Sequence, residues 1–324
     1  MSGLPAWISA ALQGKLDHVA RGVLRDRAKA ISDSYRAGGS SAVVRSDLDA
    51  LAYALVRMPA TYAAVHAALA QTIALIPGFQ PRSILDVGAG PGTASWAGVE
   101  AWPSVQRATL IDGNARLLDL ARVFHDASQR QSTAIDFVLG DLAATLESAP
   151  SADMVLASYA LTEMAPAALN DLLAALWQRA DRLLVIVEPG TVAGFQRILT
   201  CRDMLIAQGA RIVAPCSHES HCPLRDSTRW CHFAVRLARS RDHMITKGAH
   251  VPFEDEKFCY LVAGKGVADL PRGQRILATP KVSKAGVVLT LCKPDRPEQR
   301  LIERRDKEAY RAAKRCDWGD IVDV

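Results

Sequence analysis

The sequence predicts an α/β protein whose core is a mostly parallel sheet covered by helices. Between residues 83 and 190, five short runs of Val, Ile and Leu alternate with stretches of helical periodicity. Such a repeat is typical of a parallel sheet with helices on both faces. The runs end in Gly, Asp, Glu or Ser. Because the carboxyl ends of parallel strands share one edge, we expect a ligand site at that edge.

Three regions are expected along the chain. Residues 1–78 have apolar side chains at three- and four-residue spacing, which predicts a helical region, with Pro59 ending or kinking one helix. Residues 79–264 carry the sheet and a cysteine-rich insertion at 211–236. Residues 265–324 form a basic extension, in which two alternating runs predict a small hairpin followed by a short helix.

Composition and charge narrow the class of protein. The chain has 324 residues, of which 49% are hydrophobic, enough for one large domain with appendages. It has no run of eighteen apolar residues and no secretory signal, so we expect no membrane partner. The net charge of +5 comes from residues 265–324, because the first 264 residues hold 25 basic and 25 acidic side chains.

The stretch "SILDVGAGPGTASW" (83–96) follows one predicted strand and opens a helix. A dinucleotide-binding motif would place glycine where Thr93 stands, which makes a nicotinamide cofactor the weaker alternative. The spacing D-x-G-x-G-x-G resembles the first motif of class I S-adenosylmethionine (SAM) methyltransferases. The resemblance implies that Asp112 accepts the ribose hydroxyls and that Asp141 faces the adenine amine. The predicted cofactor residues are Asp86, Gly88, Ala89, Gly90, Gly92, Asp112, Asp141 and Ser158.

A methyl acceptor is harder to predict. The fourth run ends in "ASYALTEM" and lacks the Asn/Asp-Pro-Pro-Tyr signature of nucleobase amine methylation. It also lacks the Pro-Cys pair that 5-methylcytosine enzymes use. The only candidates for a general base are Tyr159 and Glu163, and Glu163 could instead begin a helix.

The segment "PCSHESHCPLRDSTRWCHF" (215–233) contains three cysteines and three histidines. The spacing Cys216-x5-Cys222-x8-Cys231 is looser than that of paired zinc ligands and suits an iron–sulfur cluster with a distant fourth thiolate. The remaining cysteines offer four candidates for that ligand. Cys201 and Cys259 lie in apolar segments, Cys316 lies near the end of the sequence, and Cys292 ends a predicted strand.

Six motifs occur in the same order as in one known family: "RMPATY", "LDVGAGPGTASW", "EPGT", "PCSHESHCPL", "WCHF" and "LCKPD". Across roughly residues 45–305 the chain resembles the methyltransferase-like proteins of the mitochondrial small ribosomal subunit and their bacterial relatives. The resemblance implies a class I SAM-methyltransferase, Rossmann-like sheet with a helical N-terminal cap. It also implies a [4Fe–4S] cluster held by Cys216, Cys222, Cys231 and Cys292. A zinc site that uses His218, His221 or His232 stays open as the alternative.

The basic extension is the predicted RNA-binding surface. Residues 271–315 hold 13 basic and 5 acidic side chains, a one-signed charge that suits phosphate contacts. The predicted contacts are Arg272, Arg275, Lys281 and Lys284. Aromatic side chains are scarce in this region, so we expect recognition of RNA backbone and shape rather than base stacking.

Together these observations predict an iron–sulfur-containing, SAM-binding methyltransferase that acts on the small ribosomal subunit, in rRNA methylation, subunit assembly or both. Two alternatives stay open: a small-molecule SAM-dependent methyltransferase and a non-catalytic ribosome-binding module. The expected partner is small-subunit ribosomal RNA or the small ribosomal subunit, and no DNA is expected. The expected location is cytoplasmic, or the mitochondrial matrix if the source is eukaryotic.

Overall fold

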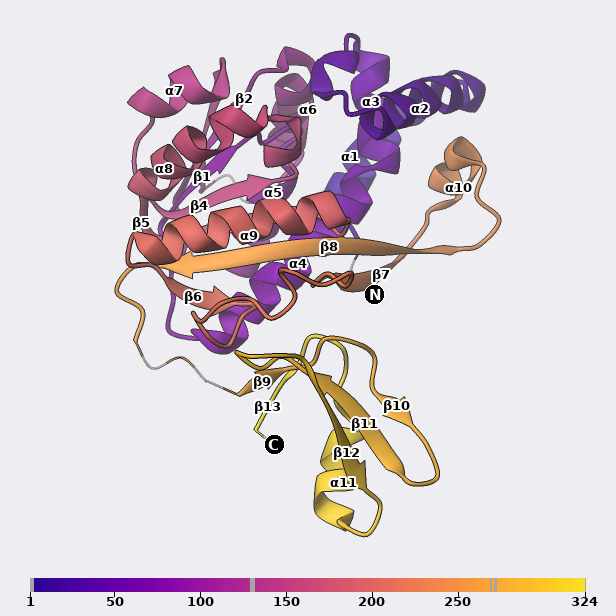
Figure 1. Cartoon of the computed structure of the whole chain (residues 1–324). Coiled ribbons are helices and arrows are strands. Elements are labelled where there is room, and N and C mark those ends of the chain that lie inside the picture. The colour runs from indigo at the N-terminus through magenta and orange to yellow at the C-terminus, as the bar shows by residue number, and fades with distance from the viewer. Residues whose placement is uncertain (1–2, 129–131, 269, 271–272, 324) are drawn as a thin grey trace.

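The computed structural model describes residues 3–128, 132–268, 270 and 273–323. Its centre is an eight-stranded sheet in the order β3-β2-β1-β4-β5-β8-β6, with β7 paired to β8 (Figure 1). The strands are β1 (Ser83–Val87), β2 (Arg107–Asp112), β3 (Ala134–Leu139), β4 (Ala152–Ser158), β5 (Ala180–Pro189), β6 (Arg211–Ala214), β7 (Phe233–Ala238) and β8 (Phe253–Gly264).

Strands β1 to β5 are parallel, and β8 runs antiparallel to β5. These five strands coincide with the five apolar runs of the sequence, so the predicted fold class is confirmed. Strand β8 also pairs with β6 and β7, which flank the cysteine-rich segment. Since β6 occupies the start of the predicted insertion, the loop itself spans 215–232 and lies at the sheet's edge.

Helices cover both faces of the sheet. One face packs against α1 to α6 and the other against α7, α8 and α9. Neighbouring residues of β4 show the alternation, because Met154 and Leu156 face the first core while Val155 faces the second. The helices are α1 (Ala6–Leu16), α2 (Arg21–Arg36), α3 (Asp47–Val56), α4 (Met58–Leu75), α5 (Thr93–Ala101), α6 (Ala115–Ala127), α7 (Leu142–Ser148), α8 (Leu169–Arg179), α9 (Val192–Ala207) and α10 (Arg241–Lys247). Short 3-10 turns are η1 (Ser41–Val43), η2 (Leu161–Glu163) and η3 (Pro166–Ala168).

The predicted helical N-terminal region is confirmed, and so is the break near Pro59. Helix α3 ends at Val56 and α4 begins at Met58, which places Pro59 in the first turn of α4. Proline is tolerated there because the first amides of a helix have no partner within the helix. No helix in the described part of the chain is both long and apolar enough to cross a membrane.

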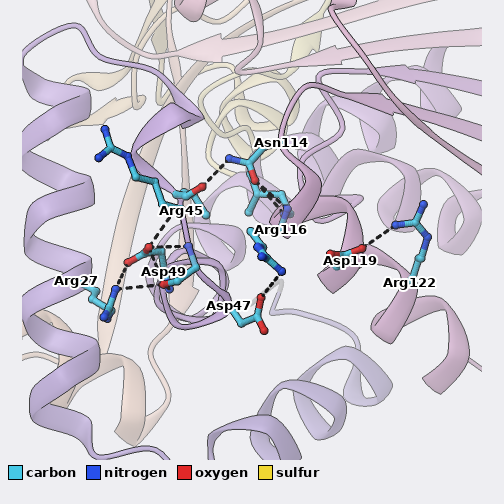
Figure 2. A network of polar contacts seen from close by, with 11 residues as sticks. Arg27, Arg45, Asp47, Asp49, Asn114, Arg116, Asp119 and Arg122 are labelled. Atoms are coloured by element: carbon cyan, nitrogen blue, oxygen red, sulfur yellow. Dashed lines mark hydrogen bonds and ion pairs between the residues drawn. The ribbon is translucent and has the colours of Figure 1, made fainter.

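A polar network ties the N-terminal helices to the start of α6 (Figure 2). The Asn114 side-chain oxygen caps α6 by accepting from the Arg116 and Leu117 amides at 3.0 and 3.3 Å. Its amide nitrogen donates to the carbonyls of Ser41 and Val44, both at 2.9 Å. One side chain therefore fixes the segment around η1 above the end of β2.

The C-terminal region forms a small module of its own beside the cysteine-rich loop (Figure 1). Its elements are β9 (Gln274–Arg275), β10 (Lys281–Val282), β11 (Gly286–Leu291), β12 (Glu298–Glu303), α11 (Lys307–Ala313) and β13 (Ile321–Val322). Strands β10, β11 and β12 form an antiparallel sheet, and β9 pairs with β13. The apolar face of β11, with Val287, Leu289 and Leu291 fully buried, packs on α11. The predicted hairpin and short helix are confirmed.

We expect Asn114→Ala to lower the free energy of unfolding by about 2 kcal/mol, because the variant loses a helix cap and two further hydrogen bonds. Urea unfolding monitored by circular dichroism measures this loss. Arg116→Ala is the matched control in the same network, since its ion pair with Asp47 is exposed. It should cost no more than about 1 kcal/mol. Equal losses for the two variants would contradict the assigned role of Asn114.

Candidate functional site

A cavity of about 840 Å³ opens at the carboxyl ends of the five parallel strands. The residues that end or follow these strands line it, as expected for an open α/β sheet. They are Gly88, Gly90, Asp112, Gly113, Gly140, Asp141, Ser158, Tyr159 and Pro189. The opposite wall comes from the N-terminal region, with Tyr35, Ser41, Tyr53, Arg57 and Thr61, and from α9.

The glycine-rich loop after β1 presents bare backbone to this cavity. Gly90 has a φ of +55°, and a Cβ built there would meet only the Leu117 Cδ1 atom, at 3.9 Å. A side chain at Gly90 would therefore fill the cavity rather than strike the protein. At Gly92, by contrast, a Cβ would lie 2.6 Å from the Trp96 indole. Gly92 thus allows close packing inside the fold, whereas Gly90 leaves room for a ligand.

Asp112 holds the loop in place from the end of β2. Its two carboxylate oxygens accept from the amides of Gly90 and Asn114, both at 2.7 Å. The side chain lines the cavity although it is only 6% exposed, and burial raises its pKa. Each oxygen keeps a second lone pair, so the carboxylate can still accept a hydrogen bond from a ligand hydroxyl.

Three of the predicted cofactor residues, Asp86, Ala89 and Gly92, do not line the cavity. Asp86 lies behind the loop, where one carboxylate oxygen accepts from the Ser95 amide at 3.0 Å and from its hydroxyl at 2.7 Å. The other oxygen is buried with no partner in the structure, and burial raises the Asp86 pKa to about 7. Asp86 therefore anchors the start of α5.

Asp141 and Ser158 both line the cavity. Asp141 also caps α7 by accepting from the Ala144 amide at 3.0 Å. The Ser158 hydroxyl lies at the end of β4, buried and without a partner among the described residues. It is a polar group available to a bound molecule.

Both candidates for a general base have other partners. The Tyr159 hydroxyl donates to Glu256 at 2.8 Å, and burial raises its pKa well above the usual value. Glu163 accepts from the Tyr35 hydroxyl at 3.0 Å and from both the amide and the hydroxyl of Ser41 at 2.9 Å. The geometry thus makes Glu163 a clasp for the N-terminal wall of the cavity.

The predicted site residues omitted the cationic side of the cavity. Arg57 lies between α3 and α4 with its guanidinium 4.5 Å from the centre of the Tyr35 ring. Arg197 of α9 donates to the buried Glu188 carboxylate at 2.7 Å. Arg57 lies in the motif "RMPATY" and Glu188 lies in the motif "EPGT". Both motifs were noted in the sequence, but neither residue was among the predicted site residues.

A second, small cavity of about 30 Å³ lies between α9, β8, the cysteine-rich loop and the C-terminal module. The four predicted cluster cysteines all line it: Cys216, Cys222, Cys231 and Cys292. Cys259, predicted to be a buried apolar residue, is 1% exposed but also lines this cavity. Its thiol donates to the Cys231 carbonyl at 3.1 Å. Cys201 and Cys316 are not among the lining residues.

Burial raises the pKa of several thiols in this cavity. Burial raises the pKa of Cys292 to about 12, helped by the thiols of Cys216 and Cys222 and opposed by the charges of Arg202 and Arg275. Burial and the neighbouring thiols also raise the pKa of Cys231. A metal cation stabilises thiolates, so a metal bound here would favour deprotonation of these thiols.

The metal predictions stay untested by this geometry. Within the described ranges, no group of three or more His, Cys, Asp or Glu side chains is arranged so that it could hold a metal ion. His218 contacts Cys292 with its Nε2 atom 3.7 Å from the sulfur. His232 instead stacks on Trp230 at 5.1 Å between ring centres, and His221 is exposed.

The structure corrects one predicted RNA contact. Arg275 is only 1% exposed and donates to the carbonyl of Pro215 at 2.6 Å, so it holds the module to the loop and cannot reach RNA. Arg272 lies outside the described residues. Lys281 and Lys284 are exposed, as predicted. The predictions missed further exposed cations of the module, whose signal was the basic run after β12: Arg304, Arg305, Lys307, Arg311, Lys314 and Arg315.

The parallel sheet, its strand order and the glycine-lined cavity define a Rossmann-like, methyltransferase-type fold. The family described as "Mitochondrial small ribosomal subunit Rsm22" matches residues 47–323, and the chain belongs to this family.

Curated relatives show the same kinship. The chain is 27% identical to the human "Ribosome assembly protein METTL17, mitochondrial", over 85% of this chain and 62% of that protein. It is 26% identical to the Schizosaccharomyces pombe "Rsm22-cox11 tandem protein 2, mitochondrial", over 85% of this chain and 43% of that protein. The chain thus spans about half the length of these relatives. Both are named as mitochondrial, so they give no support to a cytoplasmic location.

Solved structures that match part of the chain include two methyltransferases. Magnesium protoporphyrin IX methyltransferase from Synechocystis has a TM-score of 0.43 and 13% identity, covering 76% of this chain and 99% of that one. Precorrin-6y C5,15-methyltransferase from Geobacter metallireducens has a TM-score of 0.41 and 14% identity, covering 62% of this chain and 87% of that one.

Proposed function

We propose that the protein binds the small ribosomal subunit during its assembly, using the basic face of the C-terminal module to contact ribosomal RNA. The observation that carries this proposal is the exposed, predominantly positive charge of a module that is anchored to the rest of the fold. The human relative's name, a ribosome assembly protein, supports the same partner. The protein is located where this partner is, and in a eukaryotic cell we place it in the mitochondrial matrix.

The basic face is suited to phosphate contacts. Lys281 and Lys284 lie exposed on and just after β10, and the basic side chains of α11 extend the charge along the same module. Cations on such a surface release counterions when they meet RNA phosphates, so the affinity depends on salt.

Lys281→Glu combined with Lys284→Glu should weaken binding to small-subunit RNA and lower the slope of log affinity against log salt. The slope should fall by roughly 0.7 to 0.9 for each phosphate that the variant no longer neutralises. Filter binding across a salt series measures it. The matched control reverses Lys15 and Arg25, two exposed cations of the N-terminal helices. An unchanged slope in the first variant would show that the module's lysines do not touch RNA.

The second part of the proposal is that the larger cavity binds SAM. The residues present fit this cofactor: Gly90 leaves open space, Asp112 can accept from hydroxyls, and the Ser158 hydroxyl has no partner among the described residues. When bound, SAM supplies an activated methyl group. The chain's own residues bind and orient it, and the N-terminal wall clasped by Glu163 shields the cavity from water.

Methyl transfer to RNA is a second candidate function. The observation that favours it is that the cavity extends beyond the glycine loop to Arg57, Thr61, Thr191 and Arg197, which offers polar and cationic room for an acceptor. Transfer of labelled methyl groups from SAM to small-subunit RNA tests it.

Gly90→Val should abolish SAM binding, because the branched side chain projects into the cavity while meeting little of the protein. Isothermal titration calorimetry measures the affinity, and circular dichroism checks the fold. Gly209→Val is the control for backbone strain, since Gly209 also has a positive φ, +81°, but lies in open space away from the cavity. Wild-type affinity in the Gly90 variant would contradict the proposed site.

The third part of the proposal is that Cys216, Cys222, Cys231 and Cys292 hold a [4Fe–4S] cluster. The donor set supports it, because four thiols from the loop and the C-terminal module line one cavity. These four thiols would hold such a cluster, whose several irons do not require the sulfurs to converge on one point. The cavity measures only about 30 Å³, so we expect the loop to move outward on loading. The cluster would cross-link the module to the sheet.

Protein purified without oxygen should therefore contain about four irons per chain. Cys292→Ser should lose this iron and make the C-terminal module more sensitive to protease. Cys201→Ser and Cys316→Ser are the controls and should keep the iron, because neither residue lines the cavity. A colourless wild-type protein with one tightly bound zinc would replace the cluster by the zinc alternative.

A further inference from the structure

Two buried arginines flank the cysteine cavity. Arg202 of α9 is 2% exposed and Arg275 of β9 is 1% exposed, and they are the largest fully buried side chains of the described chain. A buried guanidinium stays charged, because its pKa is too high for the proton to leave. Each therefore brings a full positive charge into the interior.

Arg202 reaches the cavity from the sheet side. Its Nη2 atom donates to the carbonyls of His218 and Ser220 at 2.8 and 2.7 Å, and its side chain lines the cavity. Its Nε atom is buried without a partner in the described structure. The nearest carboxylate, Asp203, lies 3.7 Å away, is 47% exposed and also pairs with Arg225. Arg202 and Arg225 carry two positive charges and Asp203 one negative charge, so one positive charge of these three side chains is uncompensated.

Arg275 approaches from the C-terminal module. Its Nε atom donates to the Pro215 carbonyl at 2.6 Å, and its Nη1 atom donates to the Gln71 side chain at 2.8 Å and the Gly319 carbonyl at 2.5 Å. Its Nη2 atom is buried and has no partner among the described residues. No ion pair joins Arg275 to a carboxylate in the described part of the chain.

Two buried cations without buried counter-ions are unfavourable. Neutral carbonyls solvate a guanidinium but do not cancel its charge, and an uncompensated buried ion costs several kcal/mol. Arg202 lines the same cavity as Cys292, and the Cys292 amide donates to the Arg275 carbonyl at 2.8 Å. The lining side chains that can become anionic are the cysteine thiols and the Tyr260 hydroxyl, and of these the thiols are the usual ligands of an iron–sulfur cluster. An anionic centre in this cavity would remove the imbalance.

We propose that Arg202 and Arg275 are the counter-charges of an anionic metal–thiolate centre and that their positive charges raise its reduction potential. This inference rests on the proposed cluster. Four thiolates around a [4Fe–4S] core of charge 2+ form a dianion, which the two guanidiniums match. Reduction adds one more negative charge to the centre. The loss of a nearby cation makes that electron less favourable and lowers the potential.

The test uses the full chain with its cluster, and it compares neutral with charge-retaining substitutions. In an EPR-monitored redox titration, Arg202→Gln and Arg275→Gln should each shift the midpoint to a more negative potential. Arg202→Lys and Arg275→Lys restore the charge and should stay close to wild type. Arg211→Gln is the matched control, because Arg211 also contacts the loop but is 45% exposed and paired with Glu219 at 3.2 Å.

Where a variant loses its cluster, iron content per folded chain after reconstitution is the second measurement. Loss with Gln and retention with Lys supports the counter-charge role. Equal loss with Gln and Lys, or equal midpoints in all variants, would overturn it and leave only a packing role for the arginines. These outcomes differ from failure of the cluster itself, which would appear in the wild-type protein as an absence of iron and would overturn both proposals.

Discussion

The carboxylate of Asp112 organises the edge of the sheet at which the larger cavity opens. It accepts from the Gly90 amide and from the Asn114 amide, so one buried group sets the glycine loop and the start of α6 together. Asn114 then carries the constraint outward to the carbonyls of Ser41 and Val44. Because each link is a short hydrogen bond between partly or fully buried groups, the N-terminal wall and the loop keep one relative position. The larger cavity is the space that they leave.

Beside the cysteine cavity, Arg275 plays the corresponding part. Its guanidinium joins Pro215 of the cysteine-rich loop, Gln71 of α4 and Gly319 near the end of the C-terminal module. Three segments far apart in the sequence therefore meet at one side chain. The proposed contact with RNA depends on such an anchor, because phosphate contacts fix the orientation of a protein on RNA only when the basic surface is itself held in place. The buried Arg275 thus holds the module, and with it the exposed cations, against the rest of the fold.

The sequence predicted the sheet and the edge at which the larger cavity opens, because periodicity and strand-end residues are local signals. It did not distinguish the buried Arg275 from the exposed Lys281, since both lie in the same basic run. Arg275 becomes buried when β9 pairs with β13, a strand 46 residues later in the sequence. It likewise assigned Asp86 to the cofactor, although the pleat of β1 turns that carboxylate to Ser95. Nothing local to Arg202 marks it as a cavity residue. Burial and partnership depend on contacts between distant segments, which the sequence pattern does not record.

Helix α9 and strand β8 connect the two cavities. Arg197 lines the larger cavity and Arg202 lines the cysteine cavity, five positions apart on one helix and thus about 7.5 Å along its axis. In the sheet, Cys259 of β8 pairs directly with Glu188 of β5, whose carboxylate receives the Arg197 hydrogen bond. A shift of α9 at either cavity would therefore be felt at the other, because the helix packs on a sheet with little freedom to deform. The two cavities thus share one helix and one pair of strands.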